Sequence, residues 1–271
     1  MALDYLFLIP LTPDKASSKM RKALRKLCFA QLSKLKASKR VWLLSESAYD
    51  DPDFELVKTR GISKEDKLFE AGFLLEQEKE LPRYLVRLDD DDLINPAVFD
   101  RMAEAPDFDC LHDPVHWFYD LSSGRCSAQK RPWIANTAIM RTEHALAKVP
   151  AMGGSKLASD TNFLFACDHS QAWHLYFNGR DVRHSDENDP IYLRILSPRS
   201  VSSGGSDDFD LTFPFYLRRF GSWKSPFPFD KETLEPELRS LWIEMEGPLR
   251  DWKLPEKSFV SRFLNKLNPT K

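Results

Sequence analysis

The first ninety residues alternate between short apolar runs and longer stretches in which apolar side chains recur with a helical period. Residues 3–10, 41–44 and 83–88 are short and mostly apolar, which predicts buried β-strands. Residues 14–39 and 63–80 place their apolar positions on one face, which predicts two helices. Alternation of strands and helices in this order predicts a parallel sheet with right-handed crossovers.

The second half of the chain has a less regular pattern. The elements expected there are a hairpin of residues 110–121 and 125–130, an apolar run at 133–140, a helix at 159–172 and a strand at 191–196. From residue 231 onward we expect two helical stretches, separated by Gly247-Pro248 and Pro255. For the helix of residues 63–80, Ser63 is the expected N-cap.

Four consecutive aspartates, residues 89–92, follow directly on the third predicted strand. In open α/β sheets, ligands bind beyond the carboxyl ends of the strands. Alternate side chains at a strand end point the same way, so Asp89 and Asp91 are expected to converge. Two such carboxylates suit Mg²⁺ or Mn²⁺, which bind through one or two carboxylates and substrate phosphates. A solvated acidic loop is the alternative interpretation of the same residues.

Two other functions are possible for acidic clusters of this kind, and the sequence disfavours both. Residues 91–95 match the DDxxN spacing of terpene cyclases, but that spacing works on a helix and the chain before it alternates strand and helix. A nucleotidyltransferase is expected to carry a glycine-rich basic loop after its first strand, and residues 10–13 contain no glycine.

Composition narrows the class of protein further. The chain has 271 residues and a net charge of −2, which argues against nucleic acid as a partner because no global positive field exists. Its four cysteines form no CxxC pair, and no apolar stretch approaches the roughly 20 residues that span a bilayer. We therefore expect a cytoplasmic protein in a reducing environment.

Arg87 and Leu88 followed by the four aspartates resemble the DxD region of GT-A glycosyltransferases. More narrowly, this stretch is similar to that of the bacterial rhamnosyl transferase family, and the resemblance covers about residues 3–205. It implies a GT-A-like (nucleotide-diphospho-sugar transferase) three-layer α/β fold with a mostly parallel central sheet. It also implies a metal-dependent glycosyltransferase that moves a sugar, rhamnose being one option, from a nucleotide diphosphate sugar to a glycan or lipid-linked acceptor hydroxyl.

The resemblance also implies a set of site residues. Mn²⁺ or Mg²⁺ would be bound by Asp89 and Asp91; Asp90 and Asp92 could take those roles instead, because the register is ambiguous. The residues implied in donor binding are Pro10, Ser45, Glu46, Arg60, Lys67, Arg87 and Asp90. Related enzymes often carry a late histidine as a further metal ligand; residues 192–197 contain none, so His184 is the candidate.

An acceptor site is implied in the second half of the chain. Asp160 is the candidate general base, since a helix N-terminus would favour its ionised form; the alternative is that Asp160 only caps that helix. Asp168 is a second candidate for the base. Trp133 and Asn136 are candidates for the acceptor wall, with core packing and a turn as their alternatives. The expected domains are a GT-A-like catalytic domain at 1–210, with a donor half of about 1–105 and an acceptor half of about 106–210, and an aromatic, helical extension at 211–271.

Residues 15–40 hold ten basic and no acidic side chains. They predict either the solvated face of a helix or peripheral contact with an anionic membrane surface, which would place the protein at the inner face of the membrane. The basic, amphipathic residues 257–267 allow the same two interpretations. A catalytically inactive carbohydrate- or nucleotide-binding relative is the second functional hypothesis, and the missing late histidine motivates it.

Overall fold

The computed structural model describes residues 3–13, 17–49, 51–131, 137–149, 161–162, 176–197 and 222–251. The chain divides into two compact units. The first comprises Met1–His116 and Lys130–Arg194, and the second comprises Trp117–Gln129 and Ile195–Lys271. The predicted domain boundary near residue 210 lies outside the described residues, so that division stays a prediction.

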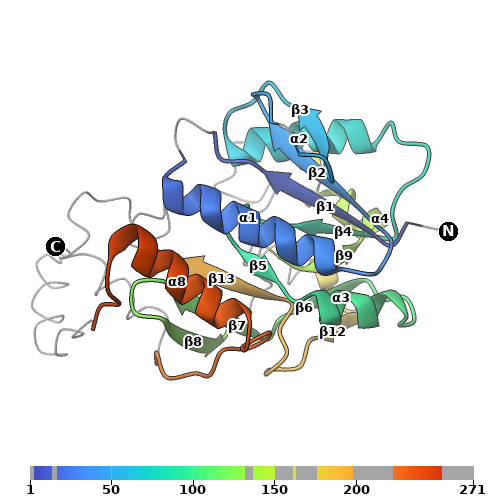
Figure 1. Cartoon of the computed structure of the whole chain (residues 1–271). Coiled ribbons are helices and arrows are strands. Elements are labelled where there is room, and N and C mark those ends of the chain that lie inside the picture. The colour runs from blue at the N-terminus through green and yellow to red at the C-terminus, as the bar shows by residue number, and fades with distance from the viewer. Residues whose placement is uncertain are drawn as a thin grey trace, which may run out of the picture. The chain divides into compact units, whose positions relative to one another are not determined.

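A seven-stranded sheet forms the centre of the first unit, in the order β12-β6-β9-β4-β1-β2-β3 (Figure 1). Its strands are β1 (Tyr5–Pro10), β2 (Lys39–Ser45), β3 (Glu55–Lys58), β4 (Tyr84–Arg87), β6 (Cys110–His112), β9 (Ile139–Arg141) and β12 (Val182–His184). Neighbouring strands are parallel except that β9 runs antiparallel to both β4 and β6. The predicted α/β fold with a mostly parallel central sheet is therefore confirmed.

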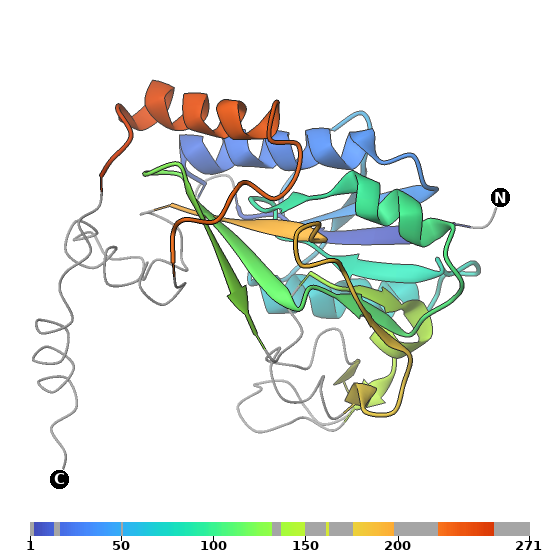
Figure 2. The same cartoon turned by 90° about the horizontal axis from the view of Figure 1, so that it is seen from below.

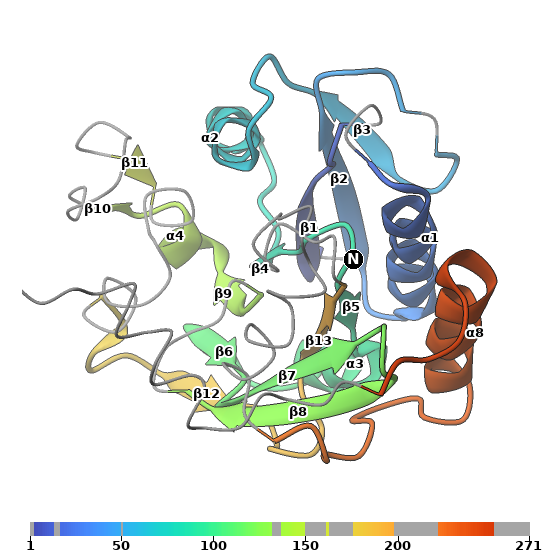
Figure 3. The same ribbon diagram turned by 90° about the vertical axis from the view of Figure 1, so that its left-hand side faces the viewer.

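Helices α1 (Lys19–Lys34) and α2 (Lys64–Leu75) cover opposite faces of this sheet, as Figure 3 shows. Side chains of β1 alternate between the two faces. Leu6 and Leu8 belong to the apolar cluster that contains Leu68 of α2. On the other face the ring of Tyr5 meets Phe99 of α3 (Pro96–Ala103) edge to face at 5.4 Å. Burial on both faces explains why β1 is almost continuously apolar.

Serine side chains fix the starts of both sheet-covering helices. Ser18 Oγ accepts the N–H of Arg21 at 3.1 Å at the start of α1. Ser63 Oγ accepts the N–H of Asp66 at 3.1 Å at the start of α2, so the predicted cap is confirmed. Both helices are shorter than the sequence pattern predicts; α1 ends at Lys34 because Leu35 turns to an extended conformation.

The predicted strand at residues 110–121 is interrupted in the structure. Asp113 and Pro114 separate β6 from β7 (Val115–Asp120), because Pro114 has no N–H to donate to a ladder. The buried Asp113 carboxylate accepts the N–H groups of Ile191 at 2.7 Å and Tyr192 at 3.3 Å. Strand β3 was not predicted, because only one of its four residues is buried and its sequence lacks a strand pattern.

The predicted helix at residues 159–172 is wrong where the structure describes it. Thr161–Asn162 form strand β11, which pairs antiparallel with β10 (Lys148–Val149). Pairing with β10 therefore decides the conformation of these two residues, although their sequence pattern has a helical period. The rest of that predicted helix lies outside the described residues.

A four-stranded sheet has the order β5-β13-β7-β8, with β5 at Leu93–Ile94, β13 at Tyr192–Leu196 and β8 at Arg125–Lys130. The hairpin of β7 and β8, in green, is plain in Figure 2.

In the second unit, Gly124 takes a φ of 64° in the turn between β7 and β8. Its carbonyl accepts a hydrogen bond from Arg239 of α8 (Leu234–Glu246) at 3.1 Å. Helix α8 confirms the first helical stretch predicted for the tail; the second lies outside the described residues.

The burial of Asp113 leads to a prediction about stability and pH. Burial raises the pKa of Asp113 to about 7, whereas an aspartate in the unfolded chain titrates at about 4. The native state therefore keeps this proton to higher pH, and its stability falls as pH rises from about 4 to about 7. An asparagine at this position cannot ionise, so D113N should lose less free energy of unfolding between pH 5 and pH 8 than the wild type, by on the order of 1 kcal/mol or more.

Urea denaturation at the two pH values measures this difference. The exposed Asp53, changed to asparagine, is the matched control and should behave as the wild type does. Equal pH dependence in D113N and the wild type would contradict the prediction.

Candidate functional site

The strand order of the central sheet reverses beside β1. From β1 the chain proceeds outward through β2 and β3, then returns to place β4 on the other side of β1. Because β1 and β4 are parallel, with Leu8 opposite Arg87, the segments after both strands leave the sheet at the same edge. Such a switch point forms the crevice where open α/β sheets bind ligands. Thr12 follows β1 there, and the four aspartates follow β4.

Asp90 is the fully buried centre of the acidic cluster. Its carboxylate accepts hydrogen bonds from Arg21 Nη2 at 2.6 Å, Arg25 Nε at 2.9 Å and the backbone N–H of Thr12 at 3.1 Å. Both arginines come from α1, and Arg25 is itself buried. A buried carboxylate needs paired charges of this kind, since an isolated one would cost several kcal/mol. Asp90 therefore joins α1 to the ends of β1 and β4.

Asp89 and Asp91 face a different environment. Their side chains keep 25% and 15% of their surface exposed, whereas Asp90 has none. Asp89 is paired with Lys64, the first residue of α2, and Asp91 with Arg21 at 2.9 Å. Asp89 and Asp91 are thus the two aspartates of the run that remain partly open to solvent.

The pKa values of these two carboxyls separate widely. Burial opposes ionisation of Asp89, but Lys64, Arg194 and Arg87 outweigh it and lower its pKa to about 2. For Asp91, burial together with the charges of Asp90 and Asp89 outweighs Arg21 and raises its pKa to about 6. Asp91 is therefore the carboxyl of this pair whose ionised form the surroundings favour less, and burial is the main reason. Carboxylate oxygens are the ligands that a divalent cation such as Mg²⁺ or Mn²⁺ prefers.

Asp92 is nearly buried, and its backbone N–H donates to the carbonyl of Asp89 at 3.2 Å. That bond closes a turn over residues 89–92, so the four side chains do not continue the alternation of an extended strand. The turn explains why the buried and the open carboxylates have separate roles within one acidic run.

Lys67 and Glu46, both predicted donor-binding residues, are brought together by the structure. Lys67 is buried in α2, donates to the carbonyl of Leu11 at 2.7 Å and pairs with Glu46 at 2.5 Å. Burial opposes ionisation of Glu46, but the bond from Lys67 holds its pKa below the usual range. The Lys67 ammonium thus contacts both the segment after β1 and the segment after β2.

The other predicted donor residues lie around the same edge with different exposure. Pro10 and Ser45 end β1 and β2 and are buried. Arg87 ends β4 and is half-buried, next to the aspartates in sequence. Arg60 is exposed, and its backbone N–H donates to Glu70 at 2.7 Å.

His184 is not brought to the acidic cluster. It ends β12, which is separated from β4 by β6 and β9 in the sheet, and its ring meets His112 at 4.6 Å. The predicted catalytic Asp160 and the predicted acceptor residues Trp133 and Asn136 lie outside the described residues. Their roles stay predictions.

Sequence reasoning missed the arginines that hold Asp90. It assigned the basic residues of 15–40 to a solvated or membrane-facing surface, and this was wrong for Arg25, which is buried. A signal was present in the sequence: Arg21 and Arg25 are four residues apart, and Arg25 lies on the helix face of Cys28 and Leu32. Within the described residues, no helix combines the length and the apolar character needed to cross a bilayer.

No protein-family model matches the chain, and neither does any curated protein. Among solved structures, the chain is similar to S. aureus TarS 1-349, at a TM-score of 0.42 and 11% identity over 90% of this chain and 73% of that one. It is also similar to the bifunctional IspDF from Campylobacter jejuni, at a TM-score of 0.41 and 15% identity, over 83% of this chain and 56% of that one. The chain thus spans about half the length of that protein. A third similar structure is a glycosyltransferase involved in the glycosylation of the major capsid of PBCV-1, at a TM-score of 0.34 and 10% identity, over 70% of this chain and 93% of that one. These likenesses concern the arrangement of the chain and assign it no activity.

The pairing of Asp90 predicts a large effect of removing Arg25. R25A would leave a buried carboxylate with only part of its compensating charge, so we expect the free energy of unfolding to fall by about 3 kcal/mol. Urea denaturation followed by circular dichroism measures it. K26A, at the exposed neighbouring position, should change stability by less than about 0.5 kcal/mol. Similar losses in both variants would show that Arg25 matters only through its helical position.

Proposed function

We propose that the chain is a metal-dependent glycosyltransferase that moves a sugar from a nucleotide diphosphate sugar to a hydroxyl of a glycan or lipid-linked acceptor. The observation that carries the proposal is the group of aspartates at the switch point between β1 and β4, of which Asp89 and Asp91 keep part of their surface exposed. A site of this kind binds a cation that in turn holds phosphates. The resemblance of residues 87–92 to the DxD region supports the same function.

In this proposal Asp89 and Asp91 hold Mn²⁺ or Mg²⁺, with Asp92 near them. When bound, the ion offsets the negative charge that grows on the departing diphosphate. Lys64 adds positive charge at the same edge, because its ammonium and the N-terminus of α2 both favour an anion. Asp90 does not bind substrate in this scheme; it positions the turn that carries the other carboxylates.

The acceptor half of the proposal comes from the sequence. Asp160 would take the proton of the acceptor hydroxyl, and Trp133 and Asn136 would contact the acceptor sugar. The transition state would have oxocarbenium character, as in glycoside hydrolysis. A rhamnosyl donor, a cytoplasmic location and contact with the inner face of a membrane are the finer parts of this proposal. For membrane contact, Arg21 and Arg25 are not available, because both are paired with Asp90.

Calorimetric titration with UDP, GDP and dTDP, with and without Mn²⁺, tests the donor site. We expect one nucleotide to bind only when Mn²⁺ is present. In D91N the affinity should fall at least about tenfold, because one of two open carboxylates has lost its charge. D53N, which alters an exposed carboxylate away from the site, should bind as the wild type does.

If none of the three nucleotides bound under either condition, the enzymatic proposal would be wrong. Metal-dependent binding without turnover of any donor would instead favour the catalytically inactive relative.

The proposed base gives a separate prediction for turnover. D160N should lower kcat by about 10²-fold or more, because proton transfer by a positioned side chain contributes that much. Nucleotide affinity should stay unchanged, since Asp160 is assigned to the acceptor and not to the donor. Donor turnover and calorimetry on the same preparation measure both. A rise in nucleotide Kd with unchanged kcat would reassign Asp160 to the donor site.

A further inference from the structure

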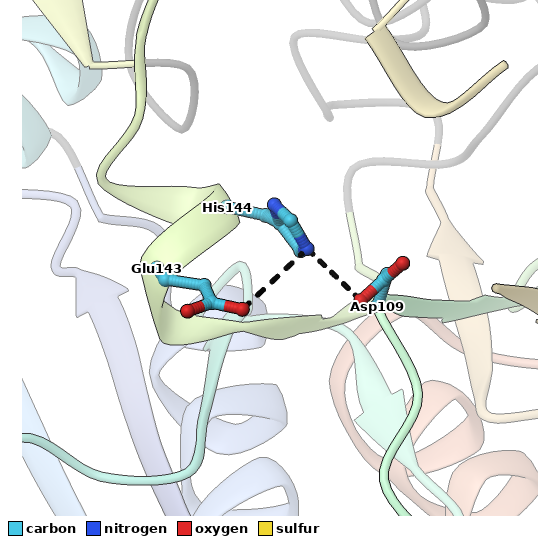
Figure 4. Close-up of side chains that lie close together, drawn as sticks. All are labelled: Asp109, Glu143 and His144. Atoms are coloured by element: carbon cyan, nitrogen blue, oxygen red, sulfur yellow. Dashed lines mark ion pairs between the residues drawn. The ribbon is translucent and has the colours of Figure 1, made fainter. Parts of the chain in front are cut away.

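Three side chains gather at the edge of the central sheet opposite the aspartates (Figure 4). Asp109 precedes β6, while Glu143 and His144 lie in α4 (Thr142–Ala145), directly after β9. Because β9 is antiparallel to β4, its end lies where β4 begins, with Arg141 opposite Tyr84. The aspartates follow the other end of β4, roughly 15 Å along the strand. The two clusters are therefore separate sites.

The ligand atoms of this group already lie close together. His144 Nε2 is 3.0 Å from Asp109 Oδ1 and 3.9 Å from Glu143 Oε1, and all three atoms lie within 4.8 Å of one another. Ligands bound to zinc at its usual distances stand about 3.0–3.4 Å apart. The first separation meets this range, and the second exceeds it by about 0.5 Å. The third, between the two carboxylates, is bounded only by 4.8 Å, so Glu143 must move toward both partners by up to about 1.4 Å. Glu143 can make that movement, because its side chain is 64% exposed.

His144 points a buried nitrogen into the group. Its side chain is only 10% exposed. Nε2 is buried and makes no well-aligned hydrogen bond; its partner is the Asp109 carboxylate, 3.0 Å away. A buried nitrogen with a single poorly aligned partner gains from a further one. A cation between Nε2 and the two carboxylates would satisfy it.

Outer contacts hold two of the three side chains in place. The other ring nitrogen of His144, Nδ1, lies 3.1 Å from the hydroxyl of Tyr176. The second oxygen of Asp109 accepts the N–H of Asp181 at 2.9 Å. Metal-binding histidines and carboxylates are typically oriented by such second hydrogen bonds, which are worth roughly 10–100-fold in affinity.

We propose that Asp109, Glu143 and His144 bind one zinc ion, with water completing its coordination. The imidazole nitrogen favours Zn²⁺ over Mg²⁺, which prefers an all-oxygen shell. Binding would take Glu143 from Arg141, now 3.2 Å away, and Arg141 would keep its contact with Asp107. The ion would fasten α4 to the segment before β6. Helix α4 leads into β10, so the ion would also fix the start of the β10–β11 pair.

Calorimetric titration of the chelator-treated full chain with Zn²⁺ tests the site. We expect wild-type protein to bind one Zn²⁺ here, and not Mg²⁺, with a thermal midpoint that rises with Zn²⁺ concentration. E143Q should weaken this binding at least about tenfold. Y176F removes only the hydroxyl that meets His144 Nδ1 and leaves the three ligands in place, and it should weaken binding by about tenfold. The matched control E104Q changes an exposed carboxylate outside the group and should bind normally.

E143Q changes an exposed side chain, so it should fold as the wild type does even if substitution of His144 disturbs the core. Co²⁺ bound in place of Zn²⁺ supplies a visible spectrum that should be lost in E143Q.

If Zn²⁺ affinity were equal in wild type, E143Q and Y176F, the group would be an ion pair of His144 and Asp109 only. D91N should keep this site; loss of zinc in D91N but not in E143Q would place the ion at the other cluster and overturn the proposal. Failure of the nucleotide titrations leaves these outcomes unaffected.

Discussion

The buried carboxylate of Asp90 is the interaction on which the switch-point edge depends. It receives two guanidinium groups from α1 and a backbone N–H from the segment after β1, while it belongs to the segment after β4. A carboxylate without solvent is tolerated only when its partners are fixed, so α1 and the segment after β1 must meet the distant segment after β4 at one point. The turn over residues 89–92 then has one conformation, and the two solvent-facing carboxylates beside it are held without binding energy from any ligand. Charge fixed in this way needs no reorganisation when a ligand arrives.

The fold of the first half could be read from the sequence, because β1, β2 and β4 are buried on both faces and the two helices bury one face each. These patterns are local, and so is the Ser63 cap. The elements that were missed depend on distant partners. Strand β3 has one buried residue and is defined by its neighbour β2, and Thr161–Asn162 became a strand through pairing with β10. The break at Asp113 depends on N–H groups nearly eighty residues away, which no local period reveals.

The candidate site divides in the same way. Its acidic residues were found because a run of four aspartates after an apolar strand is a local signal. The arginines that neutralise it were misassigned, since a basic residue on a helix is normally solvated and only the tertiary structure brings Arg25 beneath Asp90. His184 was predicted as a ligand from its residue type and its place in the sequence. In the sheet, however, β9 and β6 lie between β4 and β12, the strand that carries His184. The chemical type of a residue can be read from the sequence. Whether its charge is compensated depends on its partners in space, which only the structure shows.

The antiparallel strand β9 has a consequence for synthesis on the ribosome. Every described partner of Asp90 is made before residue 92, so β1, β2, β3 and β4 can assemble early, as soon as that length of chain has emerged. Strand β9, which covers the free edge of β4, is made some fifty residues later. At roughly 5–20 residues per second the half-built sheet shows an uncovered, apolar edge for several seconds. During that interval the nascent chain is exposed to pairing with other chains, and a chaperone that shields the edge of β4 would have its largest effect then.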